Sequence, residues 1–365
     1  MTTRTLVVGA GIIGLLTAYT LAKEGIEVIL LERNSAVGRE SSWAGGGIIS
    51  PLFPWRQHSS ITSLVNVSQD NYLAFITELK SLSNIDPEYY ITGLYWLNLE
   101  DEQQALDWAQ QYQRPLNKVD IVEVERAVSV LGSGFTSAIY MDNVANIRNP
   151  RLIRALHSIL VNMPNVHIQE NCMFTDIIQQ GGRVIGVHTS RQDYYADNVV
   201  ICTGAWLGNW LHSLGLNISV KPAKGQMILF KCAENFLPTI VLANGRYAIP
   251  RRDGHILVGS TMEYVGYDNE PTLEVQESLR QSAIEMLPEL AKAQVIQHWS
   301  GLRPAAPEGV PYIGEVPDYP GLWLNCGHFR NGFVLAPASC QLLTDLMLDR
   351  QQIVDANPYL PVNRL

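Results

Sequence analysis

The sequence predicts a mixed α/β protein in which a Rossmann-like parallel unit is interleaved with an antiparallel sheet. The chain starts with an apolar strand, a glycine-rich turn and a helix over residues 4–24. A buried strand running from residue 198 to Gly204 and a strand followed by a helix over 322–349 repeat this βα pattern. Short strands fill the gaps, and turns such as Gly181-Gly182 are typical of antiparallel pairing.

The individual elements follow from periodicity and from their end signals. The first helix is expected over 12–24, because Gly25 supplies a C-cap before the strand 27–31. Pro150 suits the first turn of another helix. Further helices are expected over 60–82, 100–111, 150–161 and 272–287. Further strands are expected over 4–8, 89–99, 136–147, 165–169, 174–179, 183–189, 225–232, 246–250, 255–260 and 294–302.

The N-terminal motif carries the chemistry of a dinucleotide site. Gly9 permits a tight turn, Gly11 lets the backbone approach a pyrophosphate, and Gly14 lets the helix and strand pack closely. Glu32 ends the second strand eighteen residues after Gly14, where it can accept hydrogen bonds from ribose hydroxyls. The alternative is a glycine-rich turn without a ligand, but the strand, helix and acid together favour dinucleotide binding.

Glu32 and a second glycine-rich segment together indicate which dinucleotide is bound. Glu32 would repel a 2′-phosphate, which disfavours NADP. The loop from Gly38 to Gly47 bears serines and three adjacent glycines, so it can lie along a pyrophosphate and the edge of a flat ring. This loop favours FAD over NAD, although a flexible surface loop is the alternative.

Composition excludes several other classes. The 365 residues are 47% apolar and 17% charged, with a net charge of −9, which disfavours nucleic acid as a partner. The five cysteines form no CxxC pair, which favours a reduced, cytoplasmic chain. We expect no membrane span, no metal site and no serine-hydrolase elbow, because the corresponding apolar run and the HExxH and GxSxG patterns are missing.

We expect the FAD-binding domain to be discontinuous in sequence. It is predicted to comprise residues 1–85, 148–220 and 300–350. The substrate-binding domain is predicted to comprise residues 86–147 and 221–299, and 351–365 form a C-terminal tail.

Over essentially its whole length, the chain resembles the D-amino-acid oxidase family of FAD-dependent oxidoreductases. The motifs that carry the resemblance are Gly9-Ala10-Gly11-Ile12-Ile13-Gly14, Ser41-Ser42-Trp43-Ala44-Gly45, Thr203-Gly204-Ala205-Trp206, Tyr247-Ala248-Ile249-Pro250-Arg251, Gly301-Leu302-Arg303-Pro304 and Gly327-His328-Phe329-Arg330-Asn331-Gly332. The C-terminal motifs are the specific ones, because the first motif fits many flavoproteins.

The resemblance assigns three residues to the substrate. Arg303 matches an arginine that grips the substrate carboxylate, and Tyr247 matches a tyrosine that adds a hydroxyl to the same carboxylate. Arg330 matches a position whose backbone carbonyl receives the substrate amine. The alternatives are an internal salt bridge for Arg303, an ordinary strand tyrosine for Tyr247, and compensation of charge on a reduced flavin for Arg330.

The resemblance also implies which residues hold the cofactor. These are Gly9, Gly11, Ile12, Ile13, Gly14, Glu32, Arg33, Ser41, Ser42, Gly45, Gly46, Gly47, Phe174, Gly204, His328, Arg330, Asn331, Gly332, Phe333 and Val334. The FAD is expected to be non-covalent, since the segment 304–309 has no cysteine and Cys326 lies in the wrong place for a flavin bond.

The reaction implied by the resemblance is oxidative deamination of glycine, with sarcosine and small D-amino acids as further substrates. Hydride would pass to flavin N5 and O₂ would be reduced to H₂O₂, giving glyoxylate and ammonia in the thiazole branch of thiamine biosynthesis. A homo-oligomer is expected. The alternatives are a D-amino-acid dehydrogenase that passes electrons to a quinone, an RNA-modifying flavoprotein, and a flavin-binding subunit without catalysis.

Overall fold

The N-terminal motif lies in a six-stranded sheet of order β18-β19-β12-β1-β2-β8. The computed structural model describes residues 3–216 and 218–364. β1, β2, β8, β12 and β19 run parallel, and β18 pairs antiparallel with β19 at one edge. The strands span Arg4–Val8 (β1), Glu27–Leu31 (β2), Val166–Gln169 (β8), Asn198–Ile201 (β12), Tyr312–Glu315 (β18) and Leu322–Cys326 (β19).

Both faces of this sheet are covered, which explains its continuous apolar strands. Val7 of β1 packs among the helices on one face, whereas its neighbours Leu6 and Val8 pack toward a small three-stranded sheet on the other. The covering helices are α1 (Ile12–Lys23), α3 (Ser59–Ser83), α6 (Asn149–Leu160) and α9 (Gly332–Met347). The small sheet consists of β9 (Phe174–Gln180), β10 (Arg183–Thr189) and β11 (Tyr194–Tyr195).

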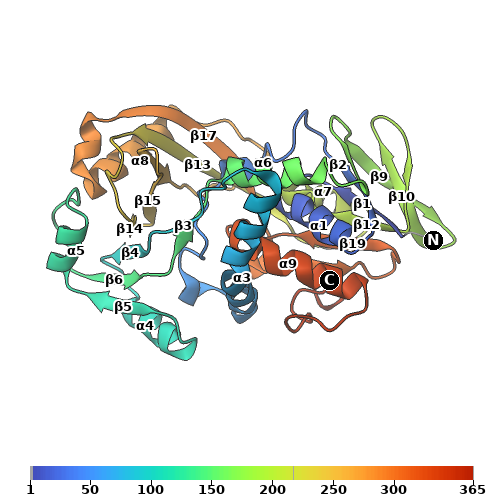
Figure 1. Ribbon diagram of the computed structural model, residues 1–365, viewed down its shortest axis with the longest axis horizontal. Coiled ribbons are helices and arrows are strands. Elements are labelled where there is room, and N and C mark those ends of the chain that lie inside the picture. The colour runs from blue at the N-terminus through green and yellow to red at the C-terminus, as the bar shows by residue number, and fades with distance from the viewer. Residues whose placement is uncertain (1–2, 217, 365) are drawn as a thin grey trace.

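An eight-stranded sheet of order β17-β13-β16-β15-β14-β4-β6-β5 forms the other end of the molecule (Figure 1). All its neighbours are antiparallel except β14 and β4. Its strands span Leu94–Leu97 (β4), Leu116–Val119 (β5), Ala138–Met141 (β6), Lys221–Lys231 (β13), Ile240–Ala243 (β14), Arg246–Pro250 (β15), His255–Gly259 (β16) and Gln294–Ala305 (β17).

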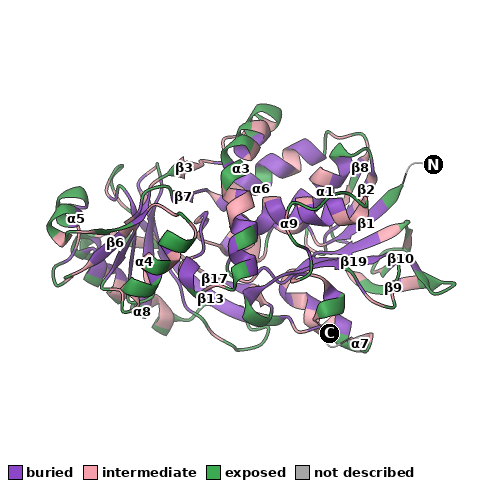
Figure 2. Cartoon of the chain, turned by 90° about the horizontal axis from the view of Figure 1, so that it is seen from below, coloured by how far each residue is buried: buried purple, intermediate pink, exposed green. Residues whose placement is uncertain are grey.

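Helices α4 (Glu102–Gln111), α5 (Ile121–Ala127) and α8 (Leu273–Met286) cover this second sheet. Figure 2 shows buried strands between more exposed helices at this end of the molecule. The remaining elements are α2 (Ser41–Ala44), α7 (Leu207–Ser213), the strand pair β3 (Tyr90–Ile91) and β7 (Ala145–Asn146), and 3₁₀ turns at Pro54–Arg56, Gly204–Trp206, Pro288–Lys292, Pro307–Gly309 and Pro361–Asn363.

The predicted fold class is confirmed, and most expected elements are present within a few residues. The expected strand over 89–99 is wrong, because Gly93 adopts a φ of +67° and divides it into β3 and β4. The extended piece over 136–147 is likewise two strands, β6 and β7. The elements α5, β5, β14 and β18 were not expected from the sequence. The residue boundaries of the two domains stay a prediction.

Candidate active site

A cavity of about 410 Å³ lies where the carboxyl ends of β1, β2 and β12 meet strands β13, β15 and β17 of the second sheet. Ligands of open α/β sheets bind at this edge, and the volume falls in the range of ligand sites. Of the predicted site residues, the following line it: Gly9, Gly11, Ile12, Ile13, Glu32, Arg33, Ser41, Ser42, Gly45, Gly46, Gly47, Phe174, Gly204, Tyr247, Arg303, His328, Arg330, Gly332 and Phe333.

Three predicted cofactor residues, Gly14, Asn331 and Val334, are not part of the cavity lining. A Cβ atom at Gly14 would lie 1.8 Å from the carbonyl oxygen of Gly9, so Gly14 serves the contact between α1 and β1. The side chain of Asn331 donates to Gln57 Oε1 at 3.2 Å, and Val334 is buried in the core between the sheet and its helices.

At the β1–β2 end of the cavity, Glu32 is held by the glycine-rich turn. Its carboxylate accepts the Ala10 N–H at 2.9 Å and the Asn34 N–H at 2.8 Å. Burial raises the pKa of the Glu32 carboxyl. Since a carboxylate has about four acceptor positions, it can also accept hydrogen bonds from a ligand in the cavity.

The side chain of Arg33 contacts other residues of the protein. Its guanidinium pairs with Glu40 at 2.5 Å and lies 3.7 Å above the ring of Trp206. The two contacts join the end of β2 to the segment before α2 and to the turn after β12. Arg33 therefore forms part of the wall of the cavity, and Trp206 is a lining residue that sequence reasoning did not assign.

Helix α2 contacts the N-terminal end of α1 through Ser42. Ser42 Oγ accepts the Ile12 N–H at 2.9 Å, and Ser41 Oγ donates to the carbonyl of Leu302. A Cβ atom at Gly11 would lie 3.0 Å from Ser42 Oγ. The turn can hold this close contact because position 11 has no side chain, and both serines remain at the cavity surface.

His328 offers an unused polar atom to the cavity. It is 2% exposed, and its Nε2 has no hydrogen-bond partner among the described residues. Burial lowers the pKa of His328 to about 3, so the imidazole is neutral at physiological pH. A buried polar atom without a partner is costly unless a ligand satisfies it, so this position fits a bound group with hydrogen-bonding atoms.

Arg303 forms the other end of the cavity. Its Nη2 donates to Ser260 Oγ at 2.8 Å and its Nη1 to the Thr261 carbonyl at 3.0 Å. Within the described ranges, no carboxylate lies at ion-pair distance from it. Burial lowers the pKa of Arg303, and a partly buried cation without a counter-ion is unfavourable, so this end of the cavity fits an anionic group.

Tyr247 and Arg330 border the same space. Tyr247 is 5% exposed, and its hydroxyl lies 4.0 Å from Met227 Sδ. The side chain of Arg330 faces the open cavity and makes no hydrogen bond or ion pair with the described residues. The structure therefore brings all three predicted substrate residues to one cavity.

Gly225 and Ser260 are functional candidates that sequence reasoning missed. Both line the cavity and contact or face the guanidinium of Arg303. Gly225 lies inside β13, and a glycine inside a strand often marks a close approach of another group. That signal could have identified Gly225, whereas nothing local distinguishes Ser260.

The described residues contain no helix with the length and hydropathy needed to cross a bilayer. They also contain no group of three or more His, Cys, Asp and Glu side chains placed to hold a metal ion.

The parallel sheet with its glycine-rich turn and the adjoining cavity are typical of enzymes that bind a nucleotide cofactor. The family model described as FAD dependent oxidoreductase (DAO) matches residues 4–346. The chain belongs to this family and is an FAD-dependent enzyme.

Individual relatives are similar over the full chain. The glycine oxidase of Pseudomonas putida strain KT2440 is 57% identical over 365 residues, covering 100% of both chains. The bifunctional protein ThiO/ThiG of Nostoc sp. strain PCC 7120 is 27% identical, covering 96% of this chain and 53% of that protein. The crystal structure of glycine oxidase from Geobacillus kaustophilus superposes with a TM-score of 0.92 at 27% identity, covering 98% of each chain.

Proposed function

We propose that this enzyme oxidises glycine with O₂ and water to glyoxylate, ammonia and H₂O₂. Two observations support the proposal together. Relatives that match this chain over its whole length carry the name glycine oxidase. The cavity ends in a half-buried arginine that has no carboxylate partner among the described residues, which suits a small substrate whose main handle is its own carboxylate.

Arg303 is the single residue on which the proposal depends most. The planar guanidinium can bind a carboxylate through two parallel hydrogen bonds. Ser260 and the Thr261 carbonyl hold it from one side. The substrate carboxylate would replace the missing counter-ion, and the Tyr247 hydroxyl would donate to the same group.

The substrate amine would be placed by the backbone at Arg330. The Arg330 carbonyl oxygen accepts no hydrogen bond from the described residues. An amine that donates to this oxygen would have its α-carbon fixed between two anchors. The amine must be neutral so that its nitrogen lone pair can assist the loss of hydride from the α-carbon. Among the described residues no strong base lines this end of the cavity, so orientation would supply much of the rate.

Bound FAD would supply the two-electron acceptor and pass the electrons to O₂. Glu32, Ser41, Ser42 and the glycines at 9, 11 and 45–47 would hold it, because they line one continuous cavity from the β1 turn to Arg303. Three cysteines also line this cavity, Cys172, Cys202 and Cys326. Burial raises the pKa of Cys326 to about 12 and that of Cys202 well above its usual value, which favours unreactive thiols and non-covalent FAD.

Oxygen uptake tests the proposal directly. The purified FAD enzyme should consume O₂ and release H₂O₂ with glycine, and we also propose activity with sarcosine and small D-amino acids. Reduction of a quinone with no O₂ consumption would instead favour the dehydrogenase alternative. Retention on a polyanion column at moderate salt would favour the RNA-modifying alternative.

We also propose that the enzyme is a cytoplasmic homo-oligomer that serves thiamine thiazole biosynthesis. The resemblance to the family supports the assembly and the pathway. The five cysteines are all free, which suits a reducing compartment. Light scattering during size-exclusion chromatography measures the assembly directly, and a single-chain mass would contradict it.

A further inference from the structure

The three glycines of the loop 45–47 have their carbonyl oxygens bound by donors that lie outside the cavity lining. The first carbonyl, of Gly45, accepts Asn149 Nδ2 at 2.8 Å. The second, of Gly46, accepts Arg251 Nη2 at 2.8 Å. The third, of Gly47, accepts the Ile147 N–H at 2.8 Å. The loop is therefore fixed from behind, on the side away from the cavity.

This arrangement determines where the amide groups of the loop point. In a trans peptide the C=O and the following N–H point in opposite directions, and these peptide bonds are trans. The N–H groups of Gly46 and Gly47 accordingly point away from the bound carbonyls. Both residues line the cavity, and neither N–H has an acceptor among the described residues.

Glycines at positions 46 and 47 allow the loop to lie this close to the residues that support it. A Cβ atom at Gly47 would lie 2.1 Å from the Ile147 carbonyl oxygen, and one at Gly46 would lie 2.9 Å from Ile249 Cδ1. Gly47 also has a φ of +74°. Because Gly47 meets backbone and has a positive φ, a side chain at this position would displace the loop from its support.

Arg251 is the charged member of this support. It directly follows β15, where Tyr247 and Ile249 share the face that contacts Gly46, and its own side chain reaches the carbonyl of Gly46. It is 8% exposed, and Nη1 donates to Asn146 Oδ1 and to the Ile147 carbonyl, each at 3.0 Å. One guanidinium therefore joins β15, the loop and the segment before α6.

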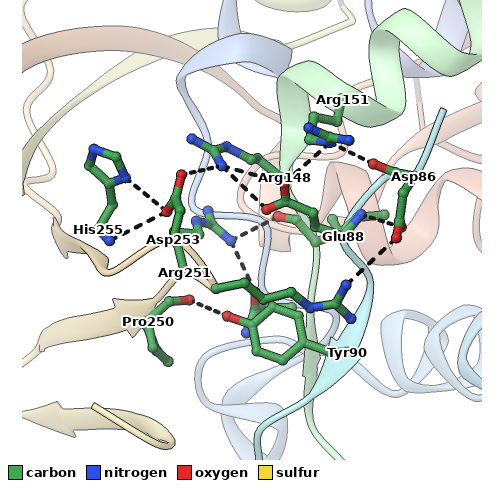
Figure 3. Close-up of polar contacts among 12 residues, drawn as sticks. Asp86, Glu88, Tyr90, Arg148, Arg151, Pro250, Arg251, Asp253 and His255 are labelled. Carbon is green, nitrogen blue, oxygen red and sulfur yellow. Dashed lines mark hydrogen bonds and ion pairs between the residues drawn. The ribbon is translucent and has the colours of Figure 1, made fainter. Parts of the chain in front are cut away.

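The neighbouring carboxylates are occupied by another arginine. Arg148 Nη1 lies 2.7 Å from Asp253 and 3.3 Å from Glu88 (Figure 3). Arg251 is left with neutral acceptors, the carbonyls of Gly46 and Ile147 and the amide of Asn146. Its guanidinium therefore donates to two backbone carbonyls, of Gly46 and Ile147, and to the side chain of Asn146.

We propose that Arg251, with Asn149, is a positioning residue that aims the N–H groups of Gly46 and Gly47 at acceptor atoms of the bound flavin ring. The inference rests on the proposal that this cavity holds FAD, but not on the identity of the amine substrate. Donors aimed at the carbonyl oxygens and nitrogens of the ring stabilise its electron-rich, reduced form. Loosening the loop should weaken FAD binding and make the flavin harder to reduce.

The substitution Arg251→Gln tests this inference, and Arg252→Gln is the matched control. Arg252 is the next residue, but it is exposed and contacts the Tyr89 carbonyl at 3.2 Å and Asp86 at 3.6 Å, away from the glycine loop. We expect Arg251→Gln to raise the dissociation constant of FAD for the apoprotein about tenfold or more, because a charged donor is lost. Its flavin midpoint potential should also fall, and its visible spectrum should change.

The control should stay within about twofold of the wild type, as expected for a surface substitution. Arg251→Lys retains the charge but loses the fork, so it should recover part of the affinity and of the potential. Equal FAD affinity and equal potential in Arg251→Gln and Arg252→Gln would overturn the inference.

Hydrogen exchange on the wild-type chain gives a test that needs no variant. The amides of Gly46 and Gly47 should exchange rapidly in the apoprotein and become protected when FAD is added. If both amides are already protected without FAD, or if FAD binds and leaves them unprotected, the proposed orientation is wrong. A wild-type chain that takes up no FAD would instead refute the cavity proposal on which the inference rests.

Discussion

The guanidinium of Arg303 occupies the space that a side chain at Gly225 would fill. A Cβ atom at position 225 would lie 2.1 Å from Nη2 and 2.2 Å from Nη1 of Arg303. The flat backbone of β13 therefore provides the surface on which the proposed substrate anchor rests.

Gly225→Ala should displace this anchor. We expect KM for glycine to rise about tenfold or more, since small misplacements of positioning groups are costly. Steady-state oxygen uptake measures KM, and FAD affinity serves as the control because Gly225 is not predicted to hold the cofactor. If the variant retains the wild-type KM, the guanidinium does not bind substrate from this position.

Arg303→Ala should have a larger effect. Removing a charged, hydrogen-bonded partner of the carboxylate is expected to cost roughly 3 kcal/mol, or a rise in KM of about a hundredfold. Tyr247→Phe removes only a neutral hydroxyl, so we expect a rise of about tenfold or less. Initial rates over a wide range of glycine concentrations distinguish the two, and the reverse order of effects would contradict these roles.

His328 should make the stability of the apoprotein depend on pH. Burial lowers the pKa of His328 to about 3, below the value near 6.5 of an exposed histidine. The unfolded chain therefore binds a proton that the folded chain rejects. Stability is fully present above the unfolded pKa and is lost as the pH falls toward 3, by up to about 1.4 kcal/mol per pH unit.

Urea unfolding of the apoprotein between these pH values measures this effect. The loss should be smaller in His328→Gln, whereas His167→Gln, at an exposed position of β8, should behave as the wild type does. Identical pH profiles for the wild type and His328→Gln would show that burial does not hold this imidazole neutral.

Gly14→Ala tests the packing of the N-terminal motif. The new Cβ would lie 1.8 Å from the Gly9 carbonyl oxygen, so α1 and β1 would have to separate. We expect a loss of about 3 kcal/mol or more in the free energy of unfolding. Gly25→Ala is the matched control at the other end of α1.

At Gly25, a new Cβ meets nothing within 4 Å, so only the strain of its positive φ is added. That strain should cost about 1 kcal/mol. Chemical denaturation of the two variants compares them, and equal losses would contradict the role of Gly14 in packing.

The N-terminal motif could be predicted because the residues that form it are close together in the sequence. A strand, three glycines and the acid at position 32 form a unit of about thirty residues, and each glycine has its own steric reason. The structure places Gly9, Gly11 and Glu32 at one cavity as expected. Phe174 and His328 also line this cavity, but only the family resemblance predicted them as cofactor residues.

The contacts around Arg303 could not be predicted in the same way, because they depend on strand register. Arg303 pairs with Ala223, and Gly225 pairs with Gly301 across β13 and β17. Because β13 and β17 lie far apart in the sequence, no short turn fixes which of their residues pair, and the register cannot be predicted from the sequence. Val334 shows the same limit, because its burial depends on how α9 packs against α1 and α3.

Anaerobic titration of the purified FAD enzyme with glycine tests the central claim most directly. We predict that glycine bleaches the visible flavin absorbance of the wild type, and that Arg303→Ala requires about a hundredfold more glycine for the same change. The claim would be contradicted if glycine left the wild-type flavin oxidised, or if the wild type and Arg303→Ala were bleached at the same concentration.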